Sequence, residues 1–141
     1  MNILFRFGPL MGDIYPPDRA PPLQDRKYFW RVYDKTSNQL KFFINGKDTK
    51  KANWMRYVLP PVMDSPQNLV AYQDGDDIFF LTIRPVMMDE ELFVWYCKDF
   101  ARRLRLPPSC QEFMDFMDVM IRNKEAKSYA SLRPDLIQRN N

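Results

Sequence analysis

The sequence contains no histidine, and only two of its 141 residues are cysteines, Cys97 and Cys110. Without an imidazole, nucleophilic sites of the Ser-His-Asp and Cys-His types are excluded, and so are the common zinc sites. Two cysteines are too few for a disulfide framework or a cysteine-bound metal cluster. We expect both to be free, buried thiols in a reducing compartment, with no metal in the protein.

Long apolar runs are also missing. No stretch approaches the ~20 residues that cross a membrane, and residues 1–7 are too short for a signal peptide. We therefore expect a soluble intracellular protein with no membrane partner. The net charge of +3 is too small to predict a nucleic-acid surface by itself. Two basic clusters are expected to be solvated faces: Lys47, Lys50 and Lys51, and Arg102, Arg103 and Arg105.

Forty-five per cent of the residues are hydrophobic and 15% are aromatic, enough to form one domain with a core. Prolines punctuate residues 1–26, which excludes a helix there and leaves loop apart from a short strand at Phe5–Phe7 and a turn at Leu10-Met11. Further strands are predicted at 28–33, 40–44, 68–73, 78–84 and 91–97.

The first two of these strands pair in a hairpin, which the turn dipeptide Asn45-Gly46 is expected to close. A helical turn is expected around 52–55. A second hairpin forms around the acidic turn 74–77, which lacks the ligand spacing and closing glutamate of a calcium loop.

Two helices are expected near the end of the sequence. The first covers 99–104, and the second covers roughly 110–125, with Ser109 and Glu112 as a capping box. Residues 126–141 are polar and expected to fray. An apolar stripe on the second helix is expected to pack back on the sheet, the alternative being a groove for a partner. The stripe consists of Cys110, Phe113, Met114, Met117, Met120 and Ile121.

The run Leu92–Trp95 has no polar face, so we expect a strand buried on both faces. Tyr96 follows it directly. The commoner role of such a tyrosine is a core residue whose hydroxyl bonds a backbone carbonyl. The other role, a site residue, depends on the rest of the chain.

Three segments occur in one order and spacing, Ala52–Val58, Gln67–Ala71 and Glu91–Tyr96. Together they resemble the PR domain, the SET-like domain of the PRDM transcriptional regulators, over about residues 5–107. Residues 7–10 and 26–31 look most like the B-lymphocyte-induced maturation protein branch. The resemblance implies a mostly β SET-like PR-domain fold of short strands and hairpins, with a pseudoknot through which the Tyr96 segment threads. It divides the chain into a PR domain, 1–107, and a C-terminal amphipathic helix with a polar tail, 108–141.

Active members of this family transfer a methyl group from S-adenosylmethionine to a lysine amine. The resemblance places Tyr96 at the catalytic tyrosine and Tyr28 beside the cofactor. Tyr28, Phe29, Trp30 and Phe80 would border the substrate.

Three departures from active members point the other way. Leu59 replaces a cofactor-contacting asparagine and is followed by Pro60, which has no N–H to donate. Phe80 replaces a second active-site tyrosine. The glycine-rich strand that cradles the cofactor is expected to be absent, as are the zinc fingers that read DNA sequence.

Three functions stay open. The favoured one is a catalytically degenerate interaction module in a nuclear transcriptional regulator, which binds chromatin-associated proteins or histone tails. The second is a histone-lysine methyltransferase that uses S-adenosylmethionine. The third is a shortened product that self-associates through an exposed sheet edge and the Met-rich helix near the end of the sequence.

Overall fold

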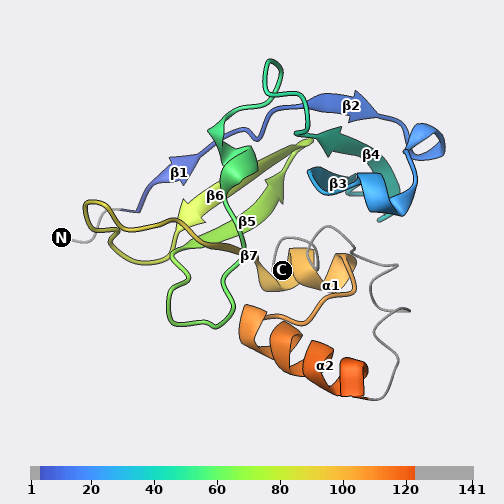
Figure 1. Cartoon of the computed structure of the whole chain (residues 1–141). Helices are drawn as coiled ribbons and strands as arrows, with labels where there is room; N and C mark the ends of the chain where they lie inside the picture. Colours follow the sequence, from blue (N-terminus) through green and yellow to red (C-terminus); the bar gives the residue numbers. More distant parts are fainter. Residues whose placement is uncertain (1–3, 123–141) are drawn as a thin grey trace.

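The computed structural model describes residues 4–122, except for the side chains of 120–122. Two sheets lie above two helices (Figure 1). The first sheet has the strand order β1-β6-β5-β7 and the second has the order β2-β4-β3. The strands are β1 Arg6–Phe7, β2 Asp13–Tyr15, β3 Phe29–Tyr33, β4 Leu40–Asn45, β5 Leu69–Asp74, β6 Asp77–Thr82 and β7 Val94–Tyr96. The helices are α1 Lys98–Arg103 and α2 Cys110–Arg122.

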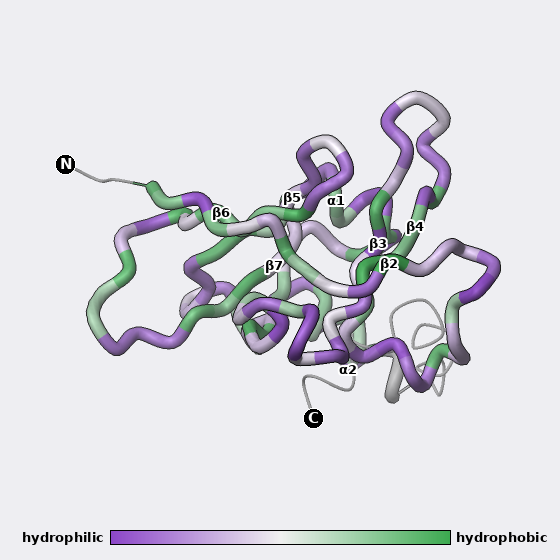
Figure 2. The backbone as a smooth tube through the Cα atoms, turned by 90° about the horizontal axis from the view of Figure 1, so that it is seen from above, coloured by the Kyte–Doolittle hydropathy of each residue, from purple (hydrophilic) through white to green (hydrophobic). Residues whose placement is uncertain are grey.

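Both predicted hairpins are confirmed: β3 pairs antiparallel with β4, and β5 pairs antiparallel with β6. The second hairpin turns at Gly75, whose φ of 64° is a left-handed conformation that glycine adopts without a side-chain clash. The hydrophobic residues gather in the strands, and hydrophilic residues dominate the turns (Figure 2).

The prediction that Asn45-Gly46 closes the first hairpin is wrong. Asn45 is the last residue of β4 and is paired on both sides, with Asp13 of β2 and Phe29 of β3. The Gly46 amide then donates to the carbonyl of Tyr28 (3.0 Å), which extends this ladder by one bond. The hairpin turns instead at residues 34–39, on the other end of β4.

The proline-rich segment contains more structure than the sequence predicts. Residues 13–15 form β2, which covers the free edge of β4. Two 3₁₀ turns follow, Pro17–Arg19 and Leu23–Asp25. A three-residue strand is too short to show an alternating pattern, so only its partner reveals it. The helical turn expected around 52–55 is confirmed as a 3₁₀ turn, Trp54–Tyr57.

The strand β7 is buried on both faces, as the apolar run predicts, with Val94, Trp95 and Tyr96 between 1% and 4% exposed. It is shorter than expected and pairs in parallel with β5. On its other side, the Val94 amide donates to the carbonyl of Leu59 (3.0 Å), and Leu59 bridges Phe93. The segment therefore passes between β5 and the chain that follows the Trp54–Tyr57 turn.

The second helix packs back on the sheets, as predicted. Phe113 is 1% exposed, and its ring centroid lies 5.4 Å from that of Trp95. Ser109 caps the helix, because its Oγ accepts the Glu112 amide (3.2 Å). Met120 and Ile121 of the predicted stripe lie outside the described side chains. Residues 126–141, which are predicted to fray, lie outside the described residues.

Both cysteines are free, as predicted; Cys110 is buried and Cys97 is half-buried. Burial, followed by the contact with the Asp64 carboxylate, raises the pKa of the Cys110 thiol to about 12. Between residues 4 and 122, no three His, Cys, Asp or Glu side chains are grouped as metal ligands would be. Among the same residues, no helix has the length and apolarity required to span a bilayer.

Asn68 is a buried polar residue whose side chain makes hydrogen bonds to a distant part of the chain. It is 0% exposed, its Oδ1 accepts the Phe93 amide (2.8 Å), and its Nδ2 donates to the carbonyl of Glu91 (2.8 Å). The Asn68 amide therefore fixes the segment that leads into β7.

We expect Asn68→Leu to lower the free energy of unfolding by about 2–3 kcal/mol, because an amide and a carbonyl lose their partners in a partly buried place. Urea unfolding measures the change. The exposed Gln24→Leu substitution is the control and should shift stability by less than about 0.5 kcal/mol. An N68L chain as stable as the native one would show that the amide does not hold this segment.

Candidate functional site

Three of the predicted site residues form one buried aromatic cluster. Tyr96 is 4% exposed, and its ring centroid lies 5.5 Å from that of Trp30. Trp30 in turn lies 5.6 Å from Phe80, which is 0% exposed. The strands β7, β3 and β6 thus bring residues 96, 30 and 80 together. Phe100 of α1 covers the ring of Tyr96 edge-on, with centroids 5.5 Å apart.

Phe29 does not join this cluster. Successive side chains of a strand point to opposite faces, so Phe29 faces away from its neighbour Trp30. Its ring packs between Tyr15 and Phe43, at 5.4 Å and 5.3 Å between centroids.

Tyr28 lies just before β3 and is half-buried. The Arg56 guanidinium lies 4.2 Å from the centre of its ring, and the Lys27 ammonium lies 5.5 Å from it. Arg56 is itself buried and donates to the Gly46 carbonyl (2.5 Å). The ring predicted to lie beside the cofactor therefore has two cations of the protein near it.

Leu59 and Pro60 both take part in the fold, although Leu59 is 37% exposed. The Leu59 carbonyl accepts the Val94 amide, and its residue bridges Phe93. Pro60 is buried and has no N–H. S-adenosylmethionine is a large polar ligand that requires a concave site with a few placed donors and acceptors. Leu59 presents an alkyl side chain and Pro60 has no N–H, so neither residue supplies a side-chain donor or acceptor for that cofactor.

Comparisons with known proteins identify the family. Residues 2–107 match the family "PR domain zinc finger protein 2, PR domain". The chain belongs to the PR domain family. Its mostly β, SET-like fold is shared with the methyltransferase domain of human PR domain-containing protein 2, at a TM-score of 0.51 and 30% identity, over 66% of this chain and 60% of that one.

Two relatives illustrate the extent of the similarity. PR domain zinc finger protein 14 of Homo sapiens is 32% identical over 106 residues, 75% of this chain and 18% of that protein. Histone-lysine N-methyltransferase set-17 of Caenorhabditis elegans is 36% identical over 74 residues, 52% of this chain and 26% of that protein. The chain thus spans 26% or less of each relative's length. These relatives support the family and give no support to the narrower B-lymphocyte-induced maturation protein branch.

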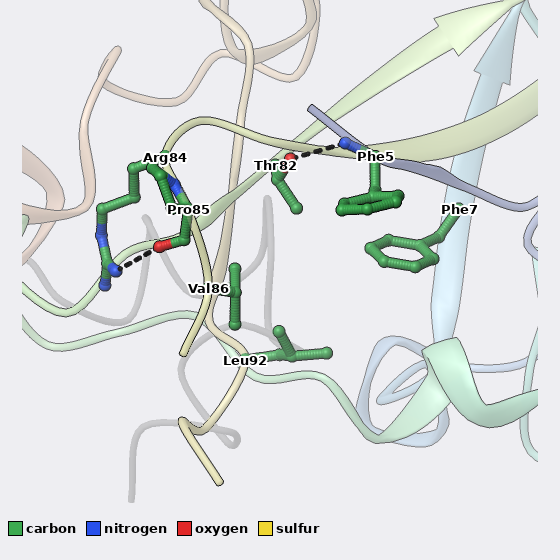
Figure 3. A pocket seen from close by; sticks show the side chains of 7 residues that line it. All are labelled: Phe5, Phe7, Thr82, Arg84, Pro85, Val86 and Leu92. Carbon is green, nitrogen blue, oxygen red and sulfur yellow. Dashed lines mark hydrogen bonds between the residues drawn. The ribbon is translucent and has the colours of Figure 1, made fainter. Parts of the chain in front are cut away.

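An apolar pocket of about 260 Å³ lies elsewhere in this PR domain, at the β1 edge of the first sheet. The rings of Phe5 and Phe7 form one side, and Val86 and Leu92 face them from the other (Figure 3). Thr82 Oγ1 accepts the Phe5 amide (2.8 Å) and ties β1 to the end of β6. The pocket suits an apolar group and contains no acid–base pair.

Sequence reasoning missed this pocket completely. None of its lining residues was a predicted site residue, and residues 85–90 show neither helical nor strand periodicity. The alternation of Phe5 and Phe7 around Arg6 is the one available signal, because it places both rings on the same face of a strand.

One ion pair supports the loop that lines the pocket. Arg84 and Glu90 lie 2.5 Å apart, and the Glu90 carboxylate also accepts the Met87 amide (2.8 Å). The bond from Arg84, followed by that from the Met87 amide, lowers the pKa of Glu90 from 4.5 to about 2. The carboxylate therefore closes the loop 84–90 in its ionised form.

Because the pKa of Glu90 is lowered in the folded chain, its stabilising effect is complete above the unfolded pKa and is lost as pH falls toward about 2. We expect Glu90→Gln to be less stable than the native chain at pH 7, with the difference shrinking between about pH 5 and pH 3. The midpoints of urea unfolding of both chains, at pH 7 and at about pH 3, measure this difference in stability. Glu91→Gln, at the exposed neighbouring position, is the control; a Glu90 difference that is independent of pH would contradict the assignment.

Proposed function

We propose that this PR domain is a protein-interaction module of a nuclear transcriptional regulator, without methyltransferase activity. The observation that carries the proposal is that the predicted cofactor residues are engaged in the fold. Leu59 pairs with the β7 segment, Pro60 is buried without a donor, and the Tyr28 ring holds Arg56. Neither of the two pockets described here is lined by any of the predicted site residues.

The expected partners are chromatin-associated proteins or histone tails, and the expected location is the nucleus. The support is the family itself, because relatives named PR domain zinc finger proteins match most of the chain. The sequence contains no histidine, so it has no Cys₂His₂ finger with which to read DNA sequence.

A histone-lysine methyltransferase is the second candidate. It is supported by Tyr96, which the family resemblance places at the catalytic position, and by the names of set-17 and of the matched methyltransferase domain. In this candidate the Tyr96 hydroxyl would orient the lysine amine, and the buried rings of Trp30 and Phe80 would exclude water from it. S-adenosylmethionine would supply the methyl group.

Calorimetric titration of S-adenosylmethionine into the purified 141-residue chain separates the two candidates. We expect no saturable heat up to millimolar ligand, and no methyl transfer to histone peptides. Saturable binding with a Kd near the micromolar range, about −8 kcal/mol, would overturn the interaction-module proposal, as would transfer to a histone lysine.

Tyr96→Phe provides an independent test. In an interaction module the substitution removes one hydroxyl, so it should change the free energy of unfolding by about 1 kcal/mol at most. Thermal and urea unfolding measure the change, with the exposed Tyr57→Phe as the matched control. A native chain that methylates histone peptides, with the activity lost in Y96F and kept in Y57F, would assign Tyr96 a catalytic role.

A further inference from the structure

A second pocket of about 420 Å³ lies between the end of β3, the start of β4 and the end of α1. Four arginines line it: Arg31, Arg102, Arg103 and Arg105. The Tyr33 hydroxyl donates to the carbonyl of Arg103 (3.3 Å) and joins the two walls. We name this site the arginine groove. The sequence predicts the last three of these arginines to be a solvated face. It does not reveal that Arg31 joins them, because Arg31 is distant from them in the chain.

The stability of α1 accounts for the positive charge at only two of the four arginine positions. Arg102 and Arg103 occupy the last turn of α1, where cations complement the helix dipole, and both pair with Asp99. Arg31 comes from β3 and Arg105 lies beyond the helix. Among residues 4–122, no carboxylate pairs with either of these two.

The backbone at Arg105 adds a second observation. Its φ is 60°, and the Leu106 amide donates back to the carbonyl of Ala101 (2.9 Å), as in a Schellman helix end. Glycine is favoured at this position, since a Cβ makes the left-handed conformation costly. Asn38, on the opposite wall, also has a φ of 60°. Residues in such conformations concentrate at functional sites.

Positive potential extends beyond the groove. The guanidiniums of Arg26 and Arg31 both lie over the ring of Phe43, at 5.3 Å and 5.5 Å from its centre. Burial, followed by the charge of Arg31, lowers the pKa of Arg26. An anionic ligand in the groove would relieve this repulsion.

The lining favours carboxylates over nucleic acid. Guanidinium groups bind carboxylates through two parallel bonds, and Asn38 and Gln39 provide exposed amides at the rim. Single-stranded nucleic acid needs exposed aromatic faces on which bases stack. The one ring in the lining, that of Tyr33, is only 7% exposed. The net charge of +3 is also small for a duplex-binding surface.

We propose that the arginine groove binds an acidic segment, rich in Asp and Glu, of a partner protein. The inference rests on the proposed function, since it names the chemistry of a partner for the interaction module. Arg31 and Arg105 provide charges that no carboxylate of the described segment neutralises, and Arg102 and Arg103 extend the surface.

The test is fluorescence anisotropy of a labelled oligoglutamate peptide with the full chain at low and physiological salt. We expect saturable, salt-sensitive binding that weakens roughly tenfold or more in the double variant Arg31→Gln/Arg105→Gln. The matched control, Lys47→Gln/Lys50→Gln, removes the same charge at exposed sites beyond the other end of β4 and should change affinity little. Because no carboxylate between residues 4 and 122 pairs with either arginine, the substitutions leave no acid of that part of the chain unpaired; thermal unfolding checks the fold.

If both double variants weakened peptide binding equally, the groove proposal would be overturned, since binding would then follow net charge alone. Absence of oligoglutamate binding would overturn it as well. DNA oligonucleotides that bind through Arg31 and Arg105 in place of the peptide would show that the assigned ligand class is wrong. Binding of a basic histone-tail peptide without oligoglutamate would remove the groove proposal and leave the interaction module standing. Only cofactor binding or methyl transfer, measured separately, would remove the module.

Discussion

The buried amide of Asn68 joins three parts of the chain that are distant in sequence. Its side chain bonds Glu91 and Phe93, and its own carbonyl accepts the amide of Ile83, just beyond β6. A buried amide is costly unless its bonds are made, so this residue accepts only one arrangement of the segment entering β7. That arrangement in turn sets the pairing of Leu59 with Phe93 and the position of Tyr96.

Once β7 is fixed, aromatic rings fill the space in which the family resemblance predicts a site. Trp30 and Phe100 contact the ring of Tyr96, and Phe80 packs against Trp30; packing of this kind stabilises the domain whether or not chemistry takes place there. The available concave surfaces lie instead at the periphery. One is apolar and lies at the β1 edge, and the other is basic and lies where β3 meets the end of α1. The interaction-module proposal rests on these two peripheral surfaces and not on the buried aromatic cluster.

Local patterns predicted the elements that depend on local forces: both hairpins, the Ser109-capped helix and the buried strand at Tyr96. They failed where a distant partner decides. Residues 13–15 form a strand only because β4 offers a free edge, and Asn45-Gly46 does not turn because β4 is already paired on both sides. For the site, the resemblance supplied the residues but not their grouping. Strand alternation separates Phe29 from Trp30, and the Tyr28 ring is held by an arginine from another element.

Several contacts of the fold join parts of the chain that are synthesised far apart: β5 pairs in parallel with β7, and Leu59 bridges Phe93. Such contacts affect the order in which the elements can assemble during synthesis. The amide of Phe5 donates to Thr82, 77 residues later. The strand β1 therefore cannot pair with β6 until the whole second hairpin has been synthesised. The β3–β4 hairpin is complete much earlier and can form first. Contacts of such long range make folding slow and leave the early aromatic residues exposed. A chaperone would therefore have the most exposed aromatic surface to cover while the chain is still being synthesised.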